Sequence, residues 1–181
     1  MRNTIACSTR FERNELMSTL QRAIELAVKA HAGQEDLPGE PYITHPMRVM
    51  LALADSGDEE LRMVGILHDA VERGTLKMKD LERESFSKAV IIGIALMTHD
   101  DETSYADYVV ALKRHKLARR VKMADLADNA DLRHVDMRPA KFKKDRMRAT
   151  RYILSYRFLA DEIDEKTYRR LMDEAEFDGG K

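Results

Sequence analysis

Several ionisable side chains in this sequence occupy positions where burial would be costly. His68 lies within an apolar helical stripe in the fragment GILHDAVE, Asp69 follows it directly, and Glu72 follows four residues later. Asp125 falls on the apolar side of another predicted helix, in VKMADLADNADL. Burying such groups costs free energy unless they are paired or bind a cation. They are therefore the first candidates for chemistry.

A structural explanation competes with a functional one at each position. His68 could form an ion pair with Glu72, or lie at a partly exposed helix edge. Asp125 could pair with an arginine, because structural ion pairs also bury carboxylates. His45 precedes Pro46 and would carry no weight alone. A second His-Asp pair, His99-Asp100, stands in the polar segment HDDETS, and we expect it to form a solvated turn.

Taken together, His45, His68, Asp69 and Asp125 form a candidate metal set. Imidazole with carboxylate suits Mn²⁺, Fe²⁺ and similar ions better than a thiolate zinc site does. Such an ion lowers the pKa of bound water and polarises a phosphoryl oxygen. Glu72 is a candidate catalytic residue that orients or deprotonates that water.

The elements that must position these residues follow a helical period. From Leu16 the apolar residues recur at intervals of four, three and one, which is typical of one helix face. Thr44, Asp58 and Ser104 are expected to cap the starts of helices. The helix that begins after Asp58 is expected to run through Val71. Further helical segments are expected at Met78–Glu84, at 86–97, around 117–125, and as one or two helices over 143–177. We find no long strand pattern, so we predict an all-α, single-domain bundle of six to eight helices.

The amino-acid composition argues against two classes of protein, one that binds nucleic acid through bulk charge and one held together by disulfides. The chain has 181 residues, 44% hydrophobic and 35% charged, with 31 basic against 32 acidic side chains. This balance disfavours a nucleic-acid-binding protein that relies on bulk charge. The single cysteine, Cys7, excludes a disulfide framework within the chain.

The sequence also predicts the location of the protein and the limits of its folded domain. No apolar run reaches the ~20 residues of a membrane span, and the first residues lack the apolar core of a secretory signal. We therefore expect no membrane association and a cytoplasmic location. We expect a flexible tail at residues 1–10, a helical domain over 11–177 and a second flexible tail at 178–181.

The sequence resembles the HD superfamily of metal-dependent phosphohydrolases. It is most similar to the hydrolase domain of the RelA/SpoT alarmone enzymes and their small stand-alone relatives. The matching segments are AIELAVKAHAGQ, GEPYITHPMRV, GILHDAVERGT and RRVKMADLADNADL, and they follow the family's order. A specific set of segments in order is stronger than a lone motif.

The resemblance implies a helical bundle of the HD type and assigns roles to individual residues. It implies that His45, His68, Asp69 and Asp125 are the metal ligands and that the metal is Mn²⁺. It places Asn129 in a nucleotide pocket. It also implies removal of the 3′-pyrophosphate from guanosine tetra- or pentaphosphate. No synthetase-like region follows in this sequence, so we expect hydrolysis alone.

Two departures from the family pattern bear on the substrate. The family carries Glu-Asp where this sequence has Glu72 and Arg73, and arginine cannot act as a base at neutral pH. The family also has basic residues where Glu35 and Asp36 stand here. Arg73 could pair with Asp69 four residues before it, or bind a substrate phosphate.

Further candidates for substrate binding lie near the metal set in sequence. Lys122 and Arg48 are candidates for phosphate, and Tyr105 could stack on a base or belong to the core. Two alternatives to alarmone hydrolysis stay open: another nucleotide or phosphoester substrate, or a weakly active regulator that binds metal or nucleotide. A homo-oligomer is compatible with the sequence.

Overall fold

The computed structural model describes residues 17–36, 39–100, 102–133, 135 and 137–177. The regular elements among them are nine α-helices and two 3₁₀ helices, with one isolated bridge between Glu35 and Pro41. The all-α prediction is confirmed. The helix count exceeds the predicted six to eight. Met78–Arg83 is a helix where a helical segment was expected, and the C-terminal region, expected as one or two helices, forms two. Cys7 and both predicted tails lie outside the described residues.

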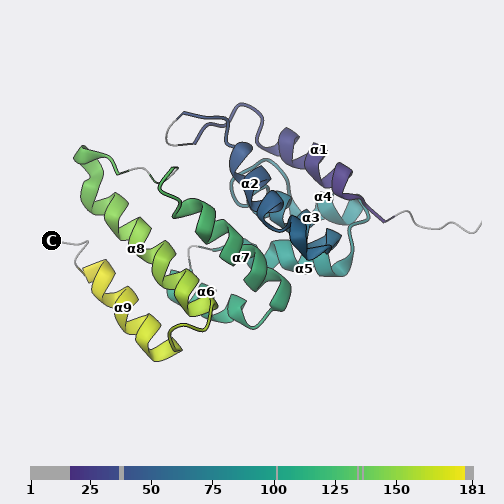
Figure 1. Cartoon of the computed structure of the whole chain (residues 1–181). Coiled ribbons are helices and arrows are strands. Elements are labelled where there is room, and N and C mark those ends of the chain that lie inside the picture. Colours follow the sequence, from purple (N-terminus) through teal and green to yellow (C-terminus); the bar gives the residue numbers. More distant parts are fainter. Residues whose placement is uncertain (1–16, 37–38, 101, 134, 136, 178–181) are drawn as a thin grey trace, which may run out of the picture.

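The helices are labelled as in Figure 1. In chain order they are α1 (Leu20–Ala30), α2 (Thr44–Ala52), η1 (Ala54–Ser56), α3 (Glu59–Leu67), α4 (Met78–Arg83), α5 (Lys88–Met97), α6 (Tyr105–Lys113), α7 (Lys116–Asn129), η2 (Pro139–Lys141), α8 (Phe142–Leu159) and α9 (Glu165–Phe177).

Side-chain caps set where several helices begin. Asp58 accepts a hydrogen bond from Leu61 N at 3.0 Å and Ser104 accepts one from Asp107 N at 3.1 Å, as predicted. Thr19 caps α1, which therefore begins at Leu20 rather than at Leu16. Thr44 is the first residue of α2 and not its cap, because its hydroxyl accepts a hydrogen bond from Arg48 instead.

The end of α3 differs from the sequence prediction. The helix stops at Leu67 with His68 at its C-cap, and residues 68–73 form turns. The amide of Ala70 donates to the carbonyl of Leu67, three residues before it, and the amide of Gly74 donates to that of Asp69, five residues before it. These bonds depart from the four-residue spacing of an α-helix. His68, Asp69 and Glu72 therefore do not share one helix face, and their spacing is set by a turn.

The core is centred on α3, which packs against α1, α2, α5 and α7. Gly65 allows α2 to approach closely, because a Cβ there would lie 2.9 Å from Leu53 Cδ1 and 3.3 Å from Met50 Cα. Gly93 serves α5 in the same way, facing the side chains of Val64 and Leu117. The helix that carries His45 and the helix that His68 follows are thus held close together.

A second group of helices, α6, α8 and α9, packs on the other side of α7 (Figure 1). The start of α8 is fixed by Asp145, a buried carboxylate that accepts hydrogen bonds from the backbone and guanidinium of Arg138. α7 therefore links the two groups. Over the part of the chain that the structure describes, no helix is both long and apolar enough to cross a membrane.

Candidate metal centre and its cavity

Three separate parts of the chain bring the four predicted ligands together. His45 lies on α2, His68 and Asp69 follow α3, and Asp125 lies on α7. Asp125 Oδ1 is 3.2 Å from His45 Nε2 and 3.5 Å from His68 Nε2. Ligand atoms of His45, His68 and Asp69 all lie within 4.8 Å of one another. This separation is compatible with one shared cation.

The two imidazoles face the cluster in the same way. His45 Nδ1 lies 2.8 Å from an Asp128 carboxylate oxygen, and His68 Nδ1 lies 2.8 Å from the carbonyl oxygen of Gly65. When Nδ1 donates to an acceptor, the neutral ring presents its Nε2 lone pair to the other side. His68 Nε2 is buried without a hydrogen-bond partner. An unsatisfied buried nitrogen aimed at two carboxylates fits a metal ligand.

The two ligand carboxylates are also held by neighbours. Asp125 accepts a hydrogen bond from Asn129 Nδ2 at 2.6 Å on Oδ1, while its Oδ2 lies 2.9 Å from Lys122 Nζ. The Tyr42 hydroxyl donates a hydrogen bond to Asp69 Oδ2. In each carboxylate, an oxygen that faces a histidine therefore also accepts a hydrogen bond from another side chain.

Asp128 and Arg48 play parts that the sequence did not predict. Asp128 is largely buried and contacts His45 Nδ1. Arg48 Nε and Nη2 donate to the Asp128 carboxylate at 2.7 and 2.9 Å. Arg48 thus supports His45 through Asp128. The carboxylate–histidine arrangement typically orients a metal-binding imidazole.

Charge and burial oppose each other in the pKa values of the cluster. Burial lowers the pKa of His45, but hydrogen bonds with Asp125 and Asp128 more than offset this and raise it to about 9. Burial would raise the pKa of Asp125, yet the Lys122 charge and the histidine contacts hold it well below its usual range. The pKa of Asp128 falls to about 2, because its bonds to His45 and Arg48 outweigh burial. Asp125 and Asp128 therefore stay ionised near neutral pH.

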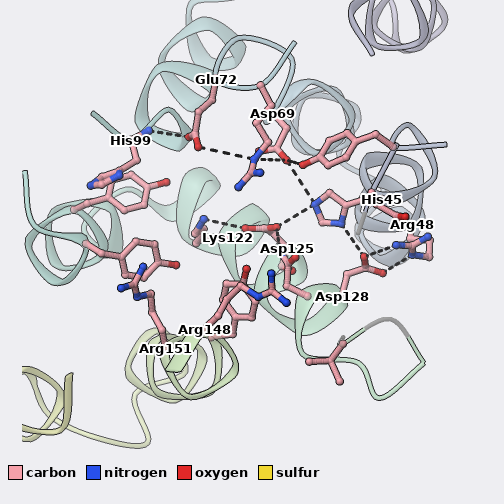
Figure 2. A pocket seen from close by; sticks show the side chains of 18 of the residues that line it. His45, Arg48, Asp69, Glu72, His99, Lys122, Asp125, Asp128, Arg148 and Arg151 are labelled. Carbon is pink, nitrogen blue, oxygen red and sulfur yellow. Dashed lines mark hydrogen bonds and ion pairs between the residues drawn. The ribbon is translucent and has the colours of Figure 1, made fainter. Parts of the chain in front are cut away.

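The cluster opens into a cavity of about 540 Å³. The cavity is lined by residues of both helix groups, and its walls carry charges of both signs. Figure 2 shows Arg148 and Arg151 reaching in from α8, opposite Asp69 and Glu72, with Asp125 and His45 between them. Other lining residues are Glu35, Asp36, Tyr42, Arg48, Arg73, His99, Tyr105, Tyr108, Lys122, Asp128, Asn129, Val135 and Tyr152.

Glu72 lies in the turn after α3 and lines this cavity, next to the loop that connects α5 to α6. One carboxylate oxygen accepts a hydrogen bond from the His99 amide at 3.0 Å, and the other lies 4.0 Å from Arg73 Nε. The competing prediction of a His68–Glu72 ion pair does not fit, since the ion pairs described for His68 are with Asp69 and Asp125. The expected solvated turn is confirmed at Asp100, which is exposed and accepts hydrogen bonds from the amides of Glu102 and Thr103. It is wrong for His99, whose ring packs 4.8 Å from that of Tyr108 and lines the cavity.

The remaining predicted substrate residues also line the cavity. Arg73 Nε lies 3.5 Å from Asp69 Oδ2, which is the pair predicted from their spacing. Tyr105 is half-buried, and the guanidinium of Arg151 lies 4.9 Å from its ring centre. Glu35 and Asp36 are at the rim.

Sequence reasoning missed Tyr42 and the α8 residues Arg148, Arg151 and Tyr152. The sequence predicts helix over this segment, as the structure shows, but no role at the site was assigned to these residues. Its three residues recur at intervals of three and one, which places them on one helix face. That spacing was the available signal.

Comparison with known proteins gives a consistent family. The model of the HD domain family matches residues 23–148. A Streptomyces coelicolor protein named GTP pyrophosphokinase is 29% identical over 87% of this chain and 19% of its own length. An Aquifex aeolicus guanosine-3′,5′-bis(diphosphate) 3′-pyrophosphohydrolase is 31% identical over 61% of this chain and 17% of its own. The Escherichia coli bifunctional (p)ppGpp synthase/hydrolase SpoT is 36% identical over 49% of this chain and 12% of its own.

A solved structure shares the fold. It is described as a metazoan ortholog of SpoT that hydrolyses ppGpp, with a TM-score of 0.63, 19% identity, and coverage of 89% of this chain and 95% of that one. The chain spans about a fifth or less of the length of the curated relatives named above. The family model, in contrast, covers most of this chain and includes all four members of the buried cluster. The chain belongs to the HD domain family.

Proposed function

We propose that this protein is a metal-dependent phosphohydrolase that removes the 3′-pyrophosphate group of a guanosine 3′,5′-bis(diphosphate)-type nucleotide. The observation that carries the proposal is the buried His45–His68–Asp69–Asp125 cluster at the base of a cavity with arginines on its opposite wall. The substrate class is supported by the names of relatives such as the Aquifex aeolicus pyrophosphohydrolase.

The cluster is suited to a divalent cation, and we propose Mn²⁺. The unsatisfied Nε2 of buried His68 needs a partner, and a set of two nitrogens and two carboxylates suits an octahedral ion. His45, His68, Asp69 and Asp125 would hold it. When bound, such an ion activates water and stabilises charge that develops on a phosphoryl oxygen.

The residues around the cluster would carry out the remaining steps. Glu72 would accept a proton from the attacking water, because its carboxylate lines the cavity and is held in place by the His99 amide. The oxygen of the water joins phosphorus, the bond from phosphorus to the 3′-oxygen breaks, and that oxygen takes up a proton. The products are GDP, or GTP, and pyrophosphate.

Binding would be shared between the two walls. Lys122, Arg148 and Arg151 would attract the phosphates, and Asn129 and Tyr105 would contact the nucleoside. Arg48 is a positioning residue in this proposal, because its guanidinium is engaged with Asp128. The same proposal gives the enzyme a role in the stringent response and a location in the cytoplasm.

The test is a product assay on the full chain loaded with Mn²⁺. The protein is incubated with a nucleotide panel that includes guanosine 3′,5′-bis(diphosphate), and phosphate is separated from pyrophosphate. We expect pyrophosphate and GDP, and a loss of at least ~100-fold in Asp125→Ala. Asp125→Asn keeps the side-chain shape if the alanine variant misfolds. The exposed Asp55→Ala is the matched control and should retain activity.

A second candidate is a nucleotide-binding regulator with weak turnover. It is favoured by Arg73, which stands where the family pattern has an acidic residue and lies 4.0 Å from Glu72. Tight nucleotide binding with no hydrolysis of any panel member would support the regulator and contradict the enzyme. Hydrolysis of a different nucleotide would keep the enzyme and replace the substrate.

A further inference from the structure

Each carboxylate around the candidate metal centre already has a cationic partner. Asp125 pairs with Lys122 at 2.9 Å and Asp128 pairs with Arg48 at 2.7 Å. Asp69 pairs with Arg73 at 3.5 Å. The negative charge that would attract a divalent cation is therefore largely offset by side chains of the protein itself. An ion added to this centre leaves it with surplus positive charge.

The three cationic partners differ in how firmly they are held. Lys122 is 12% exposed and lies at hydrogen-bond distance from Asp125. Arg48 donates two hydrogen bonds to Asp128. Arg73 is 57% exposed, and its Nε lies 3.5 Å from Asp69 and 4.0 Å from Glu72, which is beyond ordinary hydrogen-bond distance. Of these three, Arg73 can leave its carboxylate with the least loss.

Arg73 also lines the cavity that the cluster opens into. A guanidinium binds phosphate oxygens in a two-point fashion and stays charged at all working pH values. We propose that Arg73 couples metal binding to polyphosphate binding. It balances Asp69 in the ligand-free protein and moves to a phosphate group when a divalent ion and a pyrophosphate-bearing ligand bind together. This inference rests on the proposed function, which places the ion at the cluster and the phosphates in the cavity.

The same movement has a consequence for Glu72. In the ligand-free arrangement the Arg73 charge lies 4.0 Å from the Glu72 carboxylate. When Arg73 binds a phosphate group instead, part of its charge is neutralised by that group. The contact between Arg73 and Glu72 therefore belongs to the ligand-free protein and is replaced by the phosphate contact when the ligand binds.

The experiment measures binding rather than turnover. Inorganic pyrophosphate binding to the full chain is measured by equilibrium dialysis with and without Mn²⁺, and free Mn²⁺ is measured by electron paramagnetic resonance, with correction for the soluble Mn²⁺–pyrophosphate complex. For the wild type, we expect Mn²⁺ to tighten pyrophosphate binding by about tenfold or more, within the usual range of coupled sites.

The Arg73→Gln variant separates the two roles of the side chain. Removing the charge near Asp69 should tighten Mn²⁺ binding in the absence of pyrophosphate by about fivefold. It should weaken pyrophosphate binding in the presence of Mn²⁺ by about tenfold, as expected for the loss of a charge-assisted contact. The two affinities therefore move in opposite directions, which a general loss of structure would not produce.

Two further variants act as controls. Arg83→Gln removes an exposed arginine that pairs with Asp80 outside the cavity, and both affinities should stay at wild-type values. Arg73→Lys keeps the charge and loses the two-point geometry, so it should bind Mn²⁺ like the wild type and pyrophosphate with an intermediate affinity.

The inference fails if Arg73→Gln behaves like Arg83→Gln, or if both of its affinities fall together. Its failure can be told apart from failure of the proposed function. Nucleotide hydrolysis without coupled binding overturns the role of Arg73 alone. Coupled binding without hydrolysis overturns the proposed enzyme and keeps the coupling. If the wild type binds no Mn²⁺, both are overturned.

Discussion

Asp128 holds the Nδ1 side of His45 while the Nε2 side of that ring faces Asp125. The ring is thus fixed between two carboxylates from one helix, α7, although it belongs to α2. Arg48 fixes Asp128 in turn. A chain of three side chains therefore sets the direction of a single candidate ligand nitrogen, and each link depends on the one before it.

Removal of Asp128 should loosen this arrangement. In Asp128→Ala, His45 loses its Nδ1 partner and the Arg48 charge is left without that carboxylate. We expect Mn²⁺ affinity to fall by about 10–100-fold, which is typical when the support of a metal-binding histidine is lost. Titration with Mn²⁺ followed by paramagnetic resonance measures the change.

Two further variants serve as controls for this prediction. Asp128→Asn keeps the shape and loses the charge, so its affinity should fall by less. Asp55→Ala, on an exposed aspartate of η1, should bind as the wild type does. Unchanged Mn²⁺ affinity in Asp128→Ala would show that His45 is not oriented by Asp128.

At the scale of elements, the spacing between α2 and α3 determines whether His45 and His68 can meet. Gly65 lies where the two helices are nearest, and its carbonyl oxygen also accepts the contact from His68 Nδ1. The early end of α3 then turns Asp69 toward the same point. Helix contact and helix termination together build one side of the cluster.

A methyl group at Gly65 should separate the two helices. In Gly65→Ala the new Cβ would lie 2.9 Å from Leu53 Cδ1 and 3.3 Å from the Met50 backbone, so α2 has to shift. We expect the free energy of unfolding to fall by ~1–3 kcal/mol, as for other overpacked cores. Mn²⁺ affinity should fall as well, because His45 moves with α2. Denaturant unfolding and Mn²⁺ titration measure the two effects.

Gly93→Ala is the matched control for this prediction. Its Cβ would be equally crowded, at 2.8 Å from Leu117 and 2.9 Å from Val64, but these atoms are the ends of side chains and α5 carries no proposed ligand. It should lower stability with little change in Mn²⁺ affinity. Equal loss of affinity in both glycine variants would contradict the specific role of the α2–α3 approach.

At the scale of the whole molecule, the cavity lies between two groups of helices joined by α7. Asp69 and Glu72 belong to the first group, Arg148 and Arg151 belong to α8 in the second, and all four line the same space (Figure 2). A ligand that contacts both walls would stabilise the packing of one group on the other. Binding and global stability are therefore linked in this fold.

Thermal unfolding should show this linkage. With Mn²⁺ and pyrophosphate at ~100 times the dissociation constant, the native state gains ~2.7 kcal/mol. For a chain of this size that corresponds to a rise in Tm of ~5–10 °C. Asp125→Asn should lose most of the rise, and Asp55→Ala should keep it. An unchanged Tm in the wild type at saturating ligand would contradict binding in the cavity.

The sequence alone predicted the all-α class, the caps at Asp58 and Ser104, and the four residues that the fold brings together. The class and the caps rest on local information, because helical periodicity and capping depend on residues within three or four positions. The set of four residues rests also on the resemblance to the HD superfamily, since His45 carries no weight alone. The same local reasoning wrongly predicted that α3 continues to Val71, whereas the helix ends at Leu67. An apolar stripe does not reveal a turn whose hydrogen bonds depart from the helical spacing.

The partnerships around the cluster were decided by the tertiary structure. His45 and Asp128 are 83 residues apart, and no periodic pattern relates them. Arg148 and Arg151 line the cavity only because α8 packs on α7. Sequence fixes which faces of a helix are apolar, whereas side-chain packing between helices decides which polar groups meet. That is why the candidate ligands could be named from the sequence, while their supports, their charge balance and the opposite wall could not.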